Sequence, residues 1–201
     1  MGDTYRTIGK QGHSVHRVLG SKHLGFAIPI HSEAEAKECL MTFRDKYHDA
    51  HHVCYAFRCG RVDVQRNSDD GEPSGTAGKP IAGAILSAGI TQVLVIVVRY
   101  FGGTKLGTGG LIQAYKTAAQ EAIEDAGVVE DEWLDKVLIT CDYQDLPQVM
   151  MMLKHLSAVK MDLQQSENCQ LSYLLSPGKT EQLMAHSVAW KSAEVTISPV
   201  I

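Results

Sequence analysis

The sequence predicts an α+β protein of two domains, and three observations support this. Strand-like apolar segments alternate with helix-like periodic segments over residues 1–127. A short charged segment, residues 128–133, resembles a linker and follows a complete set of elements. The remaining residues, 134–201, have the element order β-α-β-β-α-β of the ferredoxin-like fold. Two small domains with a core each are compatible with a chain of 201 residues.

The chain begins with short strand-like segments. Thr4–Ile8 and Ser14–Leu19 are mixed in polarity and suit a hairpin. The segment LGFAIPI, residues 24–30, is a stronger strand, and Pro29 suggests an edge or an end of a strand. We therefore expect a small sheet to begin here.

The first helix is expected to begin at Ser32. Ser32 and Glu35 have the spacing of a capping box, in which each side chain satisfies a free backbone N–H group. The residues that share one face of this helix are Ala36, Leu40, Phe43 and Tyr47.

A strand, a loop, a helix and a buried strand follow. Residues 51–59 alternate and contain aromatic and β-branched residues, which favours a strand. The polar loop 66–80 is rich in glycine and proline and leads into a helix over Gly78–Ala88. Residues 93–101 are almost continuously apolar, a pattern typical of a strand buried on both faces.

The last helix of the first domain is expected to end at Gly127, a favourable C-cap residue. Its expected buried face consists of Ile112, Tyr115, Ala119, Ala122 and Ala126.

The C-terminal domain is expected to have four strands and two helices. The strands are predicted over residues 134–143, 159–165, 169–175 and 194–197. Asp145 can cap the first helix, and Ser176 and Pro177 open the second. The apolar stripe of the first helix is Leu146, Val149, Met150, Leu153 and Leu156.

Composition excludes several classes of protein. The net charge is −4, so a globally basic nucleic-acid-binding protein is excluded, whereas a local basic patch is not. The five cysteines contain no CxxC pair, which argues against a disulfide framework and favours small buried side chains in a reducing compartment. No secretory signal pattern and no apolar run of about 18 residues occurs, so we expect a cytoplasmic protein with no membrane span.

The segment from Arg99 to Ile123 contains five glycines between the buried strand and the helix: Gly102, Gly103, Gly107, Gly109 and Gly110. It fits neither common nucleotide fingerprint, because a P-loop ending at Lys79 would need glycine at Pro73 and the dinucleotide motif would need glycine at Ile112. Free N–H groups and the helix dipole could still favour an anion. The alternative is that these glycines only permit positive φ and close packing.

This loop and the earlier loop provide candidate contacts for a ligand or a nucleic acid. Besides the five glycines, the candidates are Lys79, Arg99, Tyr100, Lys105 and Thr108. The cations would contact phosphates, and Tyr100 would provide a stacking surface.

Two clusters of residues suggest possible metal sites. Asp69, Asp70 and Glu72 could hold Mg²⁺, or they could form an Asx-type turn and place negative charge at a helix N-terminus. A second cluster consists of His48, His51, His52, Cys54 and Cys59. Zinc would need four ligands, and no spacing here matches a zinc finger, so a packed strand beside exposed histidines is the better account. We expect no cofactor.

The two glycine-containing loops read together resemble the IMPACT/YigZ family. The motifs are DDGEPSGTAGKPI and VVRYFGGTKLGTGGLIQAYKTAA, together with DAHHVCYAFR and GSKHLGF. The resemblance covers the chain to about Ala126. Two positions depart from the family pattern: His23 replaces an aromatic residue, whose space Leu24 or Phe26 could fill, and Ala82 replaces a larger aliphatic residue.

The resemblance implies a first domain similar to domain 2 of ribosomal protein S5, with four strands and two helices on one face. It implies a second domain similar to the last domain of elongation factor G. In the family that the sequence resembles, eukaryotic members act in translational control through protein partners, and no enzymatic reaction is agreed. We expect a non-catalytic binding protein associated with translation that contacts RNA, the ribosome or a translation-regulatory protein through the two glycine loops. The alternatives are a metal-dependent enzyme acting on a phosphate ester or nucleotide, and a purely protein-binding regulator.

Overall fold

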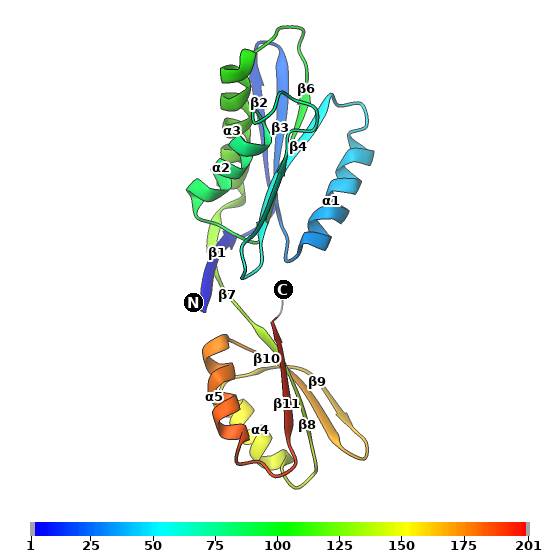
Figure 1. Ribbon diagram of the computed structural model, residues 1–201, viewed down its shortest axis with the longest axis vertical. Helices are drawn as coiled ribbons and strands as arrows, with labels where there is room; N and C mark the ends of the chain where they lie inside the picture. Colours follow the sequence, from blue (N-terminus) through cyan, green and yellow to red (C-terminus); the bar gives the residue numbers. More distant parts are fainter. Residues whose placement is uncertain (1–2, 200–201) are drawn as a thin grey trace. The chain divides into compact units, whose positions relative to one another are not determined.

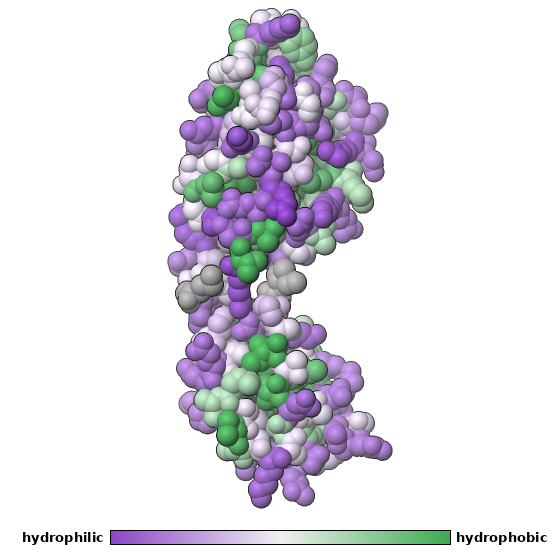
Figure 2. Space-filling view, viewed as in Figure 1, coloured by the Kyte–Doolittle hydropathy of each residue, from purple (hydrophilic) through white to green (hydrophobic). Residues whose placement is uncertain are grey.

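The computed structural model describes residues 3–199, which form an α+β protein of two compact units (Figure 1). The first unit comprises residues 6–131. The second comprises residues 132–199 together with residues 3–5. Figure 2 shows one face of the molecule, on which the surface of each unit is mostly hydrophilic with small apolar patches.

The first unit is built on a five-stranded antiparallel sheet. Its strands are β2 (Gly12–Val18), β3 (Ser21–Pro29), β6 (Val93–Tyr100), β4 (His52–Cys59) and β5 (Val64–Ser68). They lie side by side in the order β2-β3-β6-β4-β5. The central strand, β6, is completely buried from Val93 to Val98, which confirms that it is buried on both faces.

Helices cover both faces of this sheet (Figure 1). Helix α1 (Glu33–Lys46) packs on one face, and helices α2 (Gly78–Ala88) and α3 (Gly107–Ala126) pack on the other. Two helices on one face are as expected, but α1 and the fifth strand are additions to the implied arrangement.

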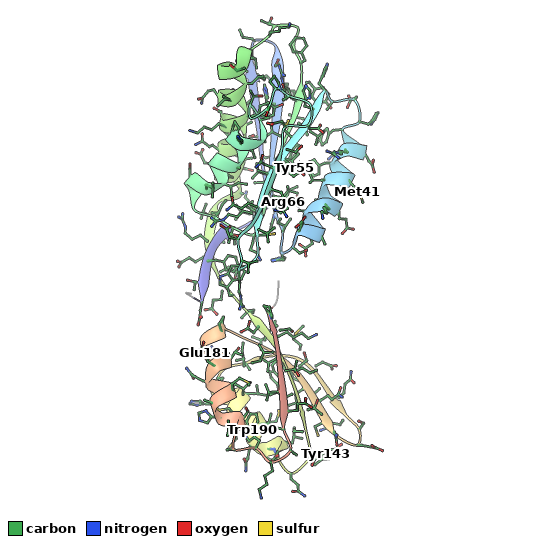
Figure 3. The ribbon with its side chains drawn as sticks, viewed as in Figure 1. Met41, Tyr55, Arg66, Tyr143, Glu181 and Trp190 are labelled. Atoms are coloured by element: carbon green, nitrogen blue, oxygen red, sulfur yellow. The ribbon has the colours of Figure 1, made fainter. Side chains whose placement is uncertain are left out.

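Strand β5 was hidden in the sequence because its residues are mostly polar. It lies at the sheet edge, where only β4 pairs with it. Arg66 pairs with Phe57 in register, and its guanidinium lies 3.9 Å from the Glu33 carboxylate of α1. Figure 3 shows Arg66 and Tyr55 on the two neighbouring strands. A charged edge strand of this kind lacks apolar alternation and discourages pairing with other chains.

The cap of α1 confirms the expected helix start. Ser32 Oγ accepts a hydrogen bond of 3.2 Å from the Glu35 N–H group. The Glu35 carboxylate accepts in turn from the His31 N–H group at 2.8 Å, one residue before the expected donor. Ala36 and Leu40 are buried against the sheet, as predicted.

The buried face of α3 differs from the prediction at one position. Tyr115, Ala119, Ala122 and Ala126 are buried, as predicted. Ile112, however, is 42% exposed, and Leu111 is buried instead. Leu111 lies four residues before Tyr115, so it continues the same helical stripe.

The first two strands do not form a hairpin with each other, which corrects the prediction. Strand β2 pairs with β3 through a two-residue turn in which Leu19 has φ +45° and Gly20 has φ +78°. Two positive φ angles match the twist of hairpin strands, but a Leu-Gly pair is an unusual sequence for such a turn.

Strand β1 (Thr4–Ile8) pairs instead with β7 (Val128–Glu132). Strand β7 thus forms within the segment expected to be a linker. Residues 3–5 belong to the second unit: the Asp3 carbonyl accepts from the Trp133 N–H group at 2.7 Å, and the Asp3 carboxylate accepts from the Gly178 N–H group at 3.3 Å. The Tyr5 ring lies 4.1 Å from the Trp133 ring between centroids.

The second unit has the predicted ferredoxin-like arrangement. Its elements are β8 (Asp135–Cys141), α4 (Leu146–His155), β9 (Val159–Gln165), β10 (Cys169–Leu175), α5 (Pro177–Ser187) and β11 (Glu194–Pro199). The antiparallel strand order β11-β8-β10-β9 places the first and third strands of the unit at its centre. This is the order that two interleaved right-handed βαβ connections produce.

The first helix of this unit departs from the prediction at its cap. Asp145 stands at the N-cap position of α4, but its carboxylate accepts from the N–H and hydroxyl groups of Ser192, each at 2.7 Å. Along the helix, Val149 and Leu153 are buried, whereas Met150 and Met151 are exposed. The predicted place of Met150 in the apolar stripe is therefore wrong.

The cysteines are all free thiols in the structure, and four are buried. Across residues 3–199, we find no helix with both the length and the apolar character needed to cross a membrane.

Candidate functional site

A cavity of about 510 Å³ lies between the two glycine-containing loops of the first unit. We call it the loop cavity. Its walls come from the entry of β4, from the loop before α2, and from the segment between the end of β6 and the first turns of α3. The lining residues are His51, His52, Glu72, Pro73, Arg99, Phe101, Lys105, Leu106, Gly107, Thr108 and Leu111. Two loops far apart in the sequence therefore share one site.

Neighbouring residues at the end of β6 face opposite sides of the sheet, as strand geometry requires. Arg99 faces α3 and lines the loop cavity. Tyr100 packs against the core on the α1 side, where its hydroxyl donates to Asp49 at 2.9 Å. Tyr100 is thus absent from the lining of the loop cavity. Phe101, 38% exposed, lines the cavity in its place.

Arg99 is held by a buried ion pair beneath the cavity. Its Nη1 lies 2.5 Å from Glu72 Oε1, and the side chains of Arg99 and Glu72 are only 7% and 3% exposed. The Tyr115 hydroxyl donates to the same oxygen at 2.8 Å. Arg99 Nε is buried and has no hydrogen-bond partner. Arg99 was expected to be a surface phosphate contact, but the structure makes it a buried member of the cavity wall.

The two aspartates of the first loop stabilise the loop itself. Asp69 accepts hydrogen bonds from the N–H groups of Gly75, Ala77 and Gly78 at 2.8, 3.0 and 2.8 Å. Burial acts to raise the pKa of Asp69, but these three hydrogen bonds and the charge of Lys79 outweigh it and lower the pKa. Asp69 therefore serves as the cap that the start of α2 otherwise lacks.

Asp70 has a similar structural role. Its carboxylate accepts from the Val53 N–H group at 2.7 Å and from the Arg44 guanidinium at 3.1 Å. Of the three acidic candidates, only Glu72 reaches the loop cavity. Within residues 3–199, no three or more His, Cys, Asp or Glu side chains form a group that could hold a metal ion. This applies to the acidic loop and to the histidine and cysteine cluster alike.

The glycines of the second loop have different functions. A Cβ atom at Gly102 would lie 1.9 Å from the Gly20 carbonyl carbon, so the second loop packs backbone against backbone on the turn between β2 and β3. Gly107 has φ +68°, which favours glycine at the start of α3. A Cβ atom at Gly109, in contrast, would meet nothing within 4 Å. Packing and backbone conformation explain the first two positions but leave Gly109 without a structural requirement.

The N-terminus of α3 has no side-chain cap. Leu106 occupies the N-cap position, and its side chain makes no capping hydrogen bond with the first N–H groups of the helix. Its first turn contains no acidic residue, and the exposed Lys105 lies immediately before it. Gly107 and Thr108 line the loop cavity. Free N–H groups, the positive end of a helix of 20 residues and a lysine together favour an anion at this position.

Two histidines on the wall have fixed hydrogen bonds. His52 Nδ1 donates to the Asp70 carbonyl at 2.8 Å, and its Nε2 lies 3.7 Å from Glu72 Oε1. His51 Nδ1 accepts from the Phe101 N–H group at 3.3 Å. Lys79 is exposed beside Gly75 and is not part of the lining.

Behind the cavity, His23 is completely buried, with its ring 5.2 Å from the Tyr115 ring in an edge-to-face arrangement. Neither ring nitrogen has a hydrogen-bond partner. Leu24 and Phe26 belong to the core on the α1 side, so the expectation that one of them fills the position of His23 is wrong. Burial, and secondarily the charges of Arg99 and His16, lower the pKa of His23 to about 4, against a smaller opposing effect of Glu72.

Cys54 and Tyr115 are buried and do not line the loop cavity, but Tyr115 contacts Glu72 of its wall. The Cys54 thiol donates to the Asp69 carbonyl at 3.0 Å and lies 3.4 Å from the Tyr115 hydroxyl oxygen. Burial raises the pKa of the Cys54 thiol to about 12 and also raises the pKa of Tyr115. Both groups therefore stay protonated near neutral pH and act as hydrogen-bond donors.

These features define a two-domain α+β protein whose first domain presents a cavity with cationic and N–H groups between two loops. The Impact N-terminal domain model matches residues 19–123, more than half of the chain. The chain therefore belongs to the IMPACT family.

Similar proteins agree with this assignment. IMPACT family member YvyE of Bacillus subtilis is 30% identical over 178 residues, which cover 88% of this chain and 82% of that protein. IMPACT family member YigZ of Escherichia coli is 36% identical over 121 residues, and the match spans 59% of each chain. A crystal structure of a hypothetical protein has a TM-score of 0.75 and 24% identity, and the match covers 97% of each chain. This last comparison shows the same fold.

Proposed function

We propose that this protein is a non-catalytic binding protein associated with translation that contacts RNA through the loop cavity. The chain belongs to the IMPACT family, so it is expected to share the general role of that family. The observation that carries the proposal is the uncapped N-terminus of α3, which faces the cavity beside Lys105. Backbone N–H groups at a helix N-terminus and lysine side chains are common phosphate contacts in nucleic-acid complexes.

The proposal is consistent with the charge of the chain. A net charge of −4 disfavours broad, non-specific attraction to RNA. A small region with Lys105, the helix N-terminus and an aromatic side chain can still bind an RNA backbone and one unstacked base. Binding should therefore be local and should involve few phosphates.

The alternatives differ in what the cavity walls must do. A metal-dependent enzyme would need a set of ligands, whereas Asp69 and Asp70 accept hydrogen bonds from the protein itself. A purely protein-binding regulator would need neither the free N–H groups nor Lys105.

The first experiment measures binding of a fluorescent single-stranded RNA over a range of salt concentrations. Lys105→Ala should weaken binding and reduce the slope of log affinity against log salt by about 0.7, the value for one phosphate contact on a single strand. Lys116→Ala is the matched control, because Lys116 is exposed on α3 but does not line the cavity. An equal effect of the two substitutions would contradict the proposal.

The second experiment uses ribosomes. The protein is incubated with ribosomes and sedimented with and without prior nuclease treatment. RNA contact predicts that co-sedimentation falls after nuclease treatment and with Lys105→Ala. A partner that stays bound after complete nuclease digestion, with no effect of Lys105→Ala, would favour a protein-binding regulator instead.

A further inference from the structure

We infer that the loop cavity is a site for one nucleotide unit, meaning a phosphate joined to a nucleoside. This inference rests on the proposed function, because the same cavity would contact RNA. Beyond the proposed function, it assigns a ligand group to each wall of the cavity and limits the size of the ligand.

One wall suits the phosphate. The first N–H groups of α3 have no side-chain acceptor, and the exposed Lys105 precedes them. A second, independent feature also points to an anion. Arg99 is only 5% exposed, lines the cavity and has an Nε with no hydrogen-bond partner. A buried guanidinium that is incompletely satisfied is costly unless an acceptor completes its hydrogen bonds.

The charge on this wall stays positive despite Glu72. That carboxylate lines the cavity, but it pairs with Arg99 and also accepts a hydrogen bond from Tyr115, so the protein itself partly neutralises its negative charge. Its side chain is only 3% exposed. Lys105 and the α3 dipole therefore remain as the groups that meet a ligand entering from solvent.

The aromatic and apolar part of the cavity lining suits a base and a ribose. Phe101 is 38% exposed, and its ring lies 6.2 Å from that of His51 and 5.5 Å from the Arg99 guanidinium. Leu106, Leu111 and Pro73 provide further apolar wall. An aromatic ring with apolar neighbours binds the face of any base by stacking.

Size limits the ligand. A volume of about 510 Å³ lies within the range of roughly 300–1,000 Å³ that small-molecule sites occupy. The cavity therefore suits a single nucleotide better than a folded RNA element. Its source could be a free nucleotide or one unit of a single RNA strand, and the two have the same chemistry at the walls.

Isothermal titration in phosphate-free buffer at low salt tests the inference with AMP, adenosine and inorganic phosphate. We expect AMP to bind at least about tenfold more tightly than either part alone. Phe101→Ala should weaken AMP about tenfold or more and leave phosphate unchanged, because stacking is lost. Lys105→Ala should weaken both AMP and phosphate, whereas Lys116→Ala should weaken neither.

Gly109 offers a sharper test, because a side chain at this position meets nothing within 4 Å. Gly109→Asp would place a carboxylate at the third position of the helix. There it would accept hydrogen bonds from the free N–H groups and repel a phosphate. Gly109→Asn is the neutral control of the same size. We expect the Asp variant to have an AMP affinity at least about tenfold below that of the Asn variant, with an equal or higher Tm.

Competition between AMP and a short single-stranded RNA distinguishes the two sources and the two proposals. Displacement of RNA by AMP supports a shared site. RNA binding without any AMP binding at millimolar concentration would overturn the nucleotide site and leave the RNA proposal intact. AMP binding without RNA binding would support a site for a free nucleotide and overturn the RNA proposal. Equal affinity for AMP and adenosine would overturn the phosphate assignment.

Discussion

The guanidinium of Arg99 and the carboxylate of Glu72, 2.5 Å apart, connect the central strand of the sheet to the loop before α2. Both side chains are almost fully buried. In Glu72→Gln, the charge of Arg99 would remain buried without a counter-charge. We expect the free energy of unfolding to fall by about 3–5 kcal/mol, measured by urea denaturation.

An exposed pair provides the control for this prediction. Lys37 and Glu33 form an i,i+4 pair on α1, with a distance of 3.0 Å and side chains that are 69% and 34% exposed. Glu33→Gln should change stability far less than Glu72→Gln, because water already solvates both charges. Similar losses of unfolding free energy in the two variants would mean that the buried Arg99–Glu72 pair stabilises the protein no more than an exposed ion pair does.

The buried His23 predicts a dependence of stability on pH. Its pKa falls from 6.5 in the unfolded chain to about 4 in the folded protein, so the unfolded chain binds more protons between these values. Stability should therefore decrease as the pH falls from 6.5 towards 4. The full difference corresponds to about 3 kcal/mol.

The variant His23→Phe isolates this contribution, since it keeps an aromatic ring beside Tyr115 and removes the titrating group. The difference in unfolding free energy between this variant and the wild type should grow in favour of phenylalanine as the pH falls below 6.5. A constant difference between pH 7.5 and pH 4.5 would show that His23 does not titrate as described.

The glycines of the second loop should tolerate alanine very differently. Gly102→Ala would place Cβ 1.9 Å from the Gly20 backbone, so either the second loop or the turn between β2 and β3 must move. We expect a loss of at least about 2 kcal/mol, seen as a lower Tm. Gly109→Ala meets nothing within 4 Å and should leave the Tm unchanged or raise it. Equal Tm values in the two variants would argue against the close approach.

The C-terminal unit permits a matched test of its core. Leu153 is 1% exposed on α4, whereas Met151 on the same helix is 72% exposed. Leu153→Ala should cost about 2–5 kcal/mol through lost burial and a cavity. Met151→Ala should stay within about 0.5 kcal/mol of the wild type. Urea unfolding followed by the fluorescence of Trp190, which packs against this core, is the measurement.

Local sequence patterns predicted the elements whose signals are themselves local. Helix α2 was expected over Gly78–Ala88 and has these limits, and α1 begins after Ser32 as its cap predicts. The C-terminal β-α-β-β-α-β order was also correct. In each case, a period of 2.0 or 3.6 residues, or a cap at fixed spacing, carries the information within about ten residues.

Long-range relationships could not be predicted in the same way. Glu72 and Arg99 are 27 residues apart, and nothing near either residue indicates that they form a pair. The polar β5 has no apolar alternation, and β1 pairs with a strand that looked like a linker. The positions of Arg99 and Tyr100 on opposite faces, however, follow from strand geometry alone and could have excluded Tyr100 from the site.

The hydrogen bonds of Asp3 affect the order in which the two units can finish folding during synthesis. Asp3 leaves the ribosome early, but Trp133 and Gly178, which donate to it, are made much later. The first unit contains its own sheet and core by residue 131 and can fold before then. The N-terminal segment must wait for the second unit, so a fragment that begins at residue 132 would lack contacts that its own fold uses.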